Sequence, residues 1–107
     1  MNTERRTDIN LDDIVAGLRP SYLEDRLDDL DLVRIFLKRG AFSEILRLGR
    51  HLASSGAAYG LPEISEVGRE LADAAMSRDE HAVARSHDRL QQTITGLIDR
   101  TGGGDSQ

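Results

Sequence analysis

The 107-residue chain contains no cysteine, so disulfide bonds and thiolate metal sites are excluded. It has no uninterrupted apolar run of membrane-spanning length, and residues 2–8 are polar throughout, unlike the apolar segment of a secretory signal. From these absences we expect a cytoplasmic protein that does not associate with membranes. The formal net charge of −5 argues against general nucleic-acid binding, which requires a basic surface.

Patterns typical of metal and nucleotide sites are also absent. Asp28, Asp29 and Asp31 lack the alternating spacing and the glycine of a calcium loop, and we expect them on a solvated helical face. His81 and His87 lack the four-residue spacing of a helical zinc pair, and we expect both to face solvent or to lie at the border of the core. No glycine-rich loop follows a strand pattern. The sequence therefore predicts neither a metal nor a cofactor.

Helical periodicity dominates what is present. With 38% hydrophobic and 31% charged residues, the chain fits one domain with one modest core. Asn10 is suited to cap a short helix over residues 11–18, and Pro20 suits the first position of a second helix that ends at Gly40. The apolar stripe of this second helix consists of Leu23, Leu27, Leu30, Val33 and Leu37.

Three further helices are predicted, joined by short connections. The first covers residues 41–59 and ends at Gly60, the next starts at Pro62 and stops near Ser77, and the last is capped by Asp79. This order favours an all-α fold over residues 10–100, an antiparallel up-and-down four-helix bundle with a short extra N-terminal helix. Residues 1–9 and the glycine-rich residues 101–107 are expected to be flexible.

The helix over residues 41–59 has an unusual outer face. On a helical wheel, Ile45, Leu48, Leu52 and Ser55 form the expected core side, flanked by two glycines, and Arg50 points the opposite way. Small and apolar side chains edged by guanidinium groups are typical of a surface on which another protein docks, although isolated exposed leucines are common. The predicted partner-binding residues are Leu46, Arg47, Arg50, Ala53, Ser54 and Ala57.

Residues 48–65 read Leu-Gly-Arg-His-Leu-Ala-Ser-Ser-Gly-Ala-Ala-Tyr-Gly-Leu-Pro-Glu-Ile-Ser. This stretch resembles the active helix of histidine phosphotransfer (HPt) domains, in which His-x-Leu-Lys-Gly is followed by Ser or Thr, small residues, an aromatic residue and Gly. In that register Arg50 occupies the slot of the phosphorylated histidine, Ala53 that of the lysine and Ser54 that of the glycine. Residues 22–30, 40–45 and 63–68 are also similar to bacterial HPt proteins, so that the resemblance covers roughly residues 18–98.

The resemblance implies a two-component phosphorelay protein that has lost its chemistry. In an active HPt domain a neutral imidazole attacks the aspartyl phosphate of a receiver domain, a lysine neutralises the phosphoryl oxygens, and a glycine leaves them room. Arg50 cannot act in this way, because its guanidinium stays protonated and only donates hydrogen bonds. We therefore expect a monomeric pseudo-HPt domain with no catalytic residue, which binds a response-regulator receiver domain or a histidine kinase.

Two alternatives remain open. His51 lies one residue beyond the phospho-acceptor slot, and an active phosphotransferase that uses its imidazole is the first alternative. One residue turns the side chain by about 100°, which places His51 at the border with a neighbouring helix and disfavours this role. The second alternative is a helical adaptor with no part in a phosphorelay.

Overall fold

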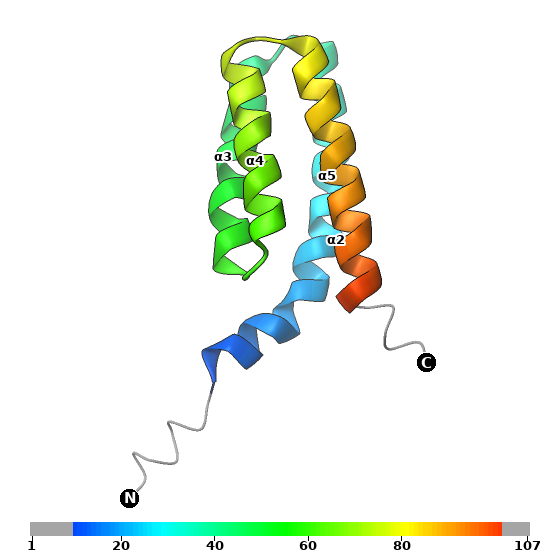
Figure 1. Cartoon of the computed structure of the whole chain (residues 1–107). Helices are drawn as coiled ribbons and strands as arrows, with labels where there is room; N and C mark the ends of the chain where they lie inside the picture. Colours follow the sequence, from blue (N-terminus) through cyan, green and yellow to red (C-terminus); the bar gives the residue numbers. More distant parts are fainter. Residues whose placement is uncertain (1–9, 102–107) are drawn as a thin grey trace, which may run out of the picture.

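The computed structural model describes residues 10–101, which form four helices: α2 (Leu11–Lys38), α3 (Phe42–Ala58), α4 (Pro62–Met76) and α5 (Glu80–Thr101). Consecutive helices run in opposite directions, and each helix packs against two others in a four-helix bundle (Figure 1). The predicted all-α class and the four-helix bundle are confirmed. No helix within residues 10–101 is long and apolar enough to cross a membrane.

The helix ends follow from local chemistry. The side chain of Asn10 accepts a hydrogen bond from the Asp12 amide at 2.8 Å, and that of Asp79 accepts one from the Ala82 amide at 3.0 Å. Gly40 and Gly60 adopt φ values of 66° and 70° in the turns after α2 and α3, a backbone conformation that glycine takes without strain. The predicted helix boundaries at these residues are confirmed.

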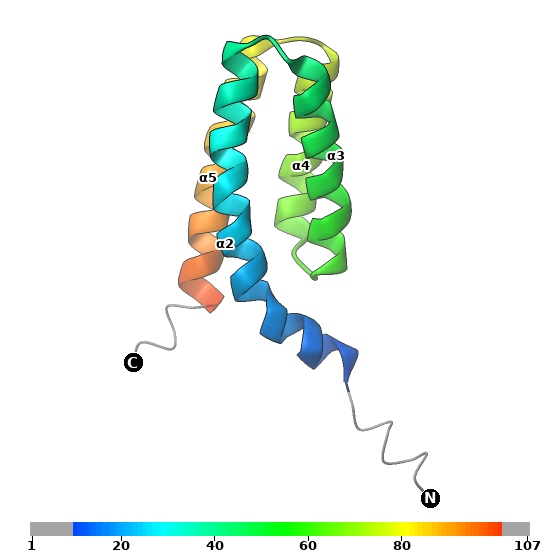
Figure 2. The same cartoon turned by 180° about the vertical axis from the view of Figure 1, so that it is seen from behind.

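The expected short N-terminal helix is not separate. Residues 11–18 are the start of α2, which continues through Pro20 to Lys38. A proline inside a helix removes one backbone hydrogen bond without always ending the helix. Figures 1 and 2 show that the first part of α2 leans away from the bundle, and a proline inside a helix is a usual cause of such a bend. The expected flexible segments lie outside the described residues, except for Thr101, which is the last residue of α5.

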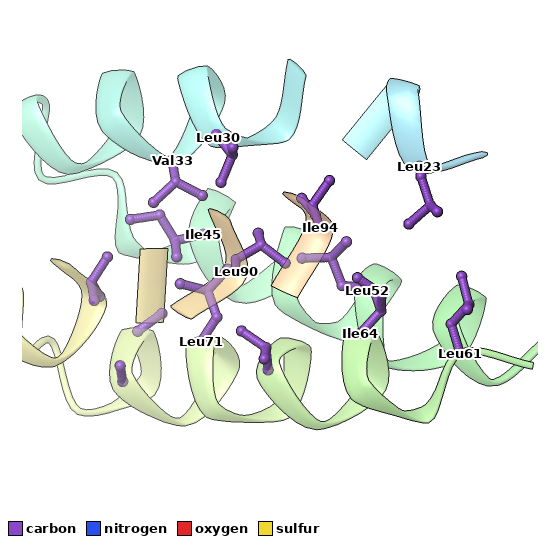
Figure 3. Packing of buried hydrophobic residues seen from close by; sticks show 14 of the residues in the cluster. Leu23, Leu30, Val33, Ile45, Leu52, Leu61, Ile64, Leu71, Leu90 and Ile94 are labelled. Atoms are coloured by element: carbon purple, nitrogen blue, oxygen red, sulfur yellow. The ribbon is translucent and has the colours of Figure 1, made fainter. Parts of the chain in front are cut away.

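The core is built from leucine, isoleucine and valine side chains of all four helices (Figure 3). The predicted stripe of α2 is confirmed at Leu23, Leu30 and Val33, which are buried, whereas Leu27 is 40% exposed. Asp29 is buried, so the expectation that Asp29 lies on a solvated face is wrong. The fully buried side chains with the largest volumes include Leu23, Ile45, Leu52, Ile64, Leu71, Leu90 and Ile94.

The environment of His87 also differs from the prediction. Its side chain is buried, with Nδ1 3.1 Å from Oδ1 of Asp88, whereas His81 is exposed as expected. The reason is register, because His87 lies four residues after Val83 and three before Leu90, both of which are in the core. Because histidine is a polar residue, the sequence pattern did not reveal that His87 lies on the apolar face of α5.

Glycines bring α3 and α4 into backbone contact. A Cβ atom added at Gly68 would lie 2.6 Å from the amide nitrogen of Ala53, and one added at Gly49 would lie 2.7 Å from that of Ala72. Real Cβ atoms do not approach backbone atoms this closely. In the same interface the hydroxyl of Ser65 donates a 2.6 Å hydrogen bond to the carbonyl oxygen of Ala53. The two helices therefore pack with no side chain between them at these points.

Substitution of Gly68 by alanine tests this contact. Alanine favours a helix interior over glycine by about 0.8–1 kcal/mol, but overpacking a fitted interior costs about 1–3 kcal/mol. The backbones of α3 and α4 would have to separate, and this cost less the gain in helix propensity leaves a net loss, so we expect Gly68→Ala to lower the free energy of unfolding by up to about 2 kcal/mol in urea titrations. Gly96→Ala is the matched control, since nothing lies within 4 Å of its added Cβ, and it should stabilise the protein. Stabilisation by both substitutions would contradict the close packing.

Candidate functional site

The buried face of α3 is rotated relative to the predicted one. Gly49 and Gly56 are buried, whereas Leu48 and Ser55, expected in the core, are only half-buried. At about 100° per residue, the centre of the buried face lies about 60° from the predicted centre, on the side that packs against α4. The cause is the glycine contact described above, which draws that side of α3 onto α4.

This rotation changes the position of Arg50. Arg50 is exposed, but it is not the residue farthest from the core, as the sequence predicted. By the same wheel, Arg47 and Ser54 lie closest to the middle of the outer face. Arg50 is inclined toward α4, and His51 is inclined the other way, toward α2. The two candidate side chains therefore belong to different surfaces.

Arg50 lines a shallow groove of about 230 Å³ between α3 and α4. Leu46 and Ala53 lie on the α3 side of the groove; both are half-buried and not fully on the solvent side, and Leu46 packs against the core. The α4 side, which the sequence analysis missed, contributes Arg69 and the 61% exposed Met76. The sequence could have indicated Met76, because it is an apolar residue directly after the apolar stripe of α4. The other predicted residues, Arg47, Ser54 and Ala57, are exposed on α3.

The guanidinium of Arg50 has no carboxylate partner within residues 10–101. Arg47, by contrast, forms an exposed ion pair with Glu44 at 3.2 Å. The hydroxyl of Ser54 donates to the carbonyl oxygen of Arg50 at 3.0 Å and so faces its own helix. The groove thus places the cation of Arg50 beside apolar side chains, and Asp73 of α4 adds one carboxylate to its lining. Because Arg50 has no ion pair with it, the cation remains available to a partner with carboxylates.

His51 is also exposed, in a second groove of about 240 Å³ between α3 and α2. Tyr22 of α2 and Ser55 of α3 share this groove, and their hydroxyl oxygens are 2.6 Å apart in a hydrogen bond. The ring of Tyr22 stacks on Tyr59 with centroids 4.2 Å apart and carries the guanidinium of Arg26 at 4.5 Å. Aromatic and polar contacts, and few aliphatic ones, therefore join α2 to α3 at this end of the bundle.

A buried carboxylate lies beside this groove. Asp29 Oδ2 lies 2.8 Å from Arg26 Nε in an ion pair. Burial raises the pKa of Asp29, and the positive charges of Arg26 and, to a smaller extent, His51 oppose that rise in the pKa. A phosphoryl group on His51 would share its groove with the carboxylate of Asp25, and the cation of Arg26 is already paired with Asp29. The α2–α3 groove is therefore a poor place to hold a phosphoryl group.

Two substitutions test this electrostatic order. Arg26→Met should raise the pKa of Asp29 more than His51→Gln does, because Arg26 is the stronger of the two opposing charges. An acid whose pKa is raised by folding costs stability once it ionises, so the free energy of unfolding of Arg26→Met should fall as the pH rises through the ordinary pKa of Asp toward the folded one. NMR titration of the Asp29 carboxyl carbon measures the pKa in each variant. A larger rise in His51→Gln would refute the assignment.

Within residues 10–101, no group of three or more acidic or histidine side chains is placed to hold a metal ion. Comparison of the chain with protein-family models, with curated proteins and with solved structures gives no match. The resemblance to HPt domains rests on the residues given above, and membership of that family stays a prediction.

Proposed function

We propose that this protein is an HPt-like signalling domain that binds a response-regulator receiver domain, or a histidine kinase, without carrying phosphate. Three observations support the proposal. The chain is a four-helix bundle, residues 48–65 resemble the active helix of HPt domains, and Arg50 stands in the phospho-acceptor slot. The observation that carries most weight is the exposed guanidinium of Arg50, which has no carboxylate partner in the described part of the chain.

The chemistry of a receiver domain complements this surface. In the family that the chain resembles, the receiver presents an acidic pocket that holds Mg²⁺ and the phosphorylatable aspartate. A guanidinium can pair with two carboxylate oxygens at once and would compete with the metal for them. Leu46 and Met76 supply apolar contact beside the cation, and Ala53 leaves room for a close approach. These contacts would bind a receiver domain without transferring a phosphoryl group to or from it.

Phosphate transfer is not expected at this surface. Arg50 has no lone pair to attack a phosphoryl group, since its guanidinium stays protonated at all relevant pH values. Ala53 provides no charge to neutralise phosphoryl oxygens. The protein would therefore act by occupying its partner, either to sequester it or to assemble it with other components.

Charge reversal of Arg50 tests the binding surface. Arg50→Glu should weaken binding of a receiver domain from the same cell by at least about tenfold, since an attractive pair with its acidic pocket becomes repulsive. Leu46→Asp should act in the same direction through the apolar contact. Isothermal titration calorimetry measures both, against a panel of receivers isolated by pull-down.

Two exposed residues on other faces provide matched controls. Arg85→Glu on α5 repeats the charge reversal and Leu32→Asp on α2 repeats the polar substitution, and both should bind like the wild type. Equal affinity in Arg50→Glu and Arg85→Glu would favour the helical adaptor with no part in a phosphorelay. Absence of binding to any receiver or kinase would refute the proposal.

The exposed imidazole of His51 keeps the active phosphotransferase as a second candidate. Incubation with a phosphorylated receiver, followed by assay for acid-labile, base-stable phosphate on this chain, separates the two functions. We expect no such phosphate, because Asp25 lines the groove of His51, the cation of Arg26 there is already paired, and the slot of the transferring histidine holds Arg50. Phosphate that appears on the wild type and is lost in His51→Gln would establish the second function instead.

A further inference from the structure

Two Gly-Arg pairs, one in α3 and one in α4, lie where the backbones of these helices meet. Gly49 precedes Arg50, and Gly68 precedes Arg69. A Cβ atom added at either glycine would lie 2.8 Å from the carbonyl oxygen of the other. Because α3 and α4 run in opposite directions, the residues that directly follow the two glycines turn to the same side of the helix pair. Arg50 and Arg69 therefore line one groove.

The guanidiniums of Arg50 and Arg69 are both available to a partner. Both residues are exposed, and neither forms an ion pair within residues 10–101. Asp73 adds a carboxylate to the lining of the groove, but it also lines a cleft of about 690 Å³ on the other side of α4, between α4 and α5. Its charge therefore lies at the edge of the groove, on the outer side of α4. Two cations of like charge in one groove repel each other, and a partner with two carboxylates would relieve that repulsion.

We propose that Arg69 is the second cation of the binding site and that Arg50 and Arg69 together displace a divalent metal ion from the acidic pocket of a receiver domain. This inference rests on the proposed function. Two guanidiniums carry the same charge as one Mg²⁺, and each can pair with a carboxylate through two hydrogen bonds. Mg²⁺ binds to the same carboxylate oxygens. The receiver is therefore bound in its metal-free form, and Mg²⁺ opposes binding.

Calorimetric titrations at increasing Mg²⁺ concentration test the displacement of the metal. They use the receiver domain that binds most tightly in the panel described above. Its apparent Kd should rise in proportion to the Mg²⁺ concentration once Mg²⁺ exceeds its own Kd for the receiver. Ionic strength is held constant with NaCl, which separates this competition from the screening of surface charges. An apparent Kd that does not rise with Mg²⁺ would overturn the proposal.

Two substitutions with opposite expected signs test the role of Arg69. Arg69→Gln should raise the Kd at least about tenfold in Mg²⁺-free solution, because one carboxylate of the partner then loses its cation. Asp73→Asn should instead lower the Kd about two- to fivefold, since it removes a carboxylate that opposes an acidic partner. The matched controls are Arg85→Gln and Asp99→Asn on α5, which make the same changes at exposed residues elsewhere and should bind like the wild type.

The outcomes separate this inference from the proposed function. Equal binding by Arg69→Gln and Arg85→Gln would refute the inference, whereas binding that still depends on Arg50 would leave the proposed function in place. Absence of binding to any receiver would refute both. A measurement without substitution uses the NMR signals of the arginine Nε–H groups. Those of Arg50 and Arg69 should shift when the receiver is added and that of Arg85 should not, and an unshifted Arg69 signal would also refute the inference.

Discussion

Backbone contact between α3 and α4 determines where every side chain of α3 points. Gly49 and Gly56 on one helix meet Gly68 and Ser65 on the other, and no side chain separates the two at these positions. Helices usually lie 8–10 Å apart because side chains interdigitate between them, and glycine allows a closer approach. The resulting rotation places Arg50 over α4 and His51 over α2. The separation of the Arg50 cation from the imidazole of His51 is thus a consequence of the small residues in the α3–α4 contact.

The other contact of α3 is of a different kind. Tyr22, Tyr59 and Arg26 join α2 to α3 with stacked rings, a cation over a ring and hydroxyl hydrogen bonds. Directional contacts of this type fix the relative orientation of the helices and keep polar and charged atoms in the interface. Helices α3 and α4 therefore form the tightly packed pair of the bundle. Helix α2 contacts this pair through aromatic rings, hydroxyl groups and a charged guanidinium. The two grooves differ in character for this reason: the α3–α4 groove has apolar side chains beside Arg50, which is unpaired among the described residues, whereas the α2–α3 groove is lined by aromatic rings and by Arg26, which is paired with Asp29.

Much of the architecture could be predicted from the sequence because its signals are local. Asn10, Gly40, Gly60 and Asp79 act on the nearest turn of backbone, and each ends or begins a helix where the sequence indicated. Pro20 misled the prediction, because a proline is compatible both with the first turn of a helix and with the interior of a bent one.

The site was harder to predict because it depends on packing between helices. A wheel drawn for α3 alone counts large apolar residues, so it assigned Leu48 to the core and treated Gly49 as a border. The burial of glycines can be recognised only when the opposite helix is known. His87 was missed for a related reason, since its position matched the apolar register but its residue type did not. Arg69 and Met76 join the groove from α4, and no pattern within α3 contains that information.

The hydrogen bond from Arg19 to the Tyr59 carbonyl links the first part of α2 to the end of another helix. Tyr59 follows the last residue of α3, where unpaired carbonyl groups and the helix dipole concentrate negative charge. A guanidinium at that point acts as a C-terminal cap supplied from a distant part of the chain. The fraying of the last turn of α3 is therefore controlled by α2, and amide hydrogen exchange there would report on the state of a segment forty residues earlier in the sequence.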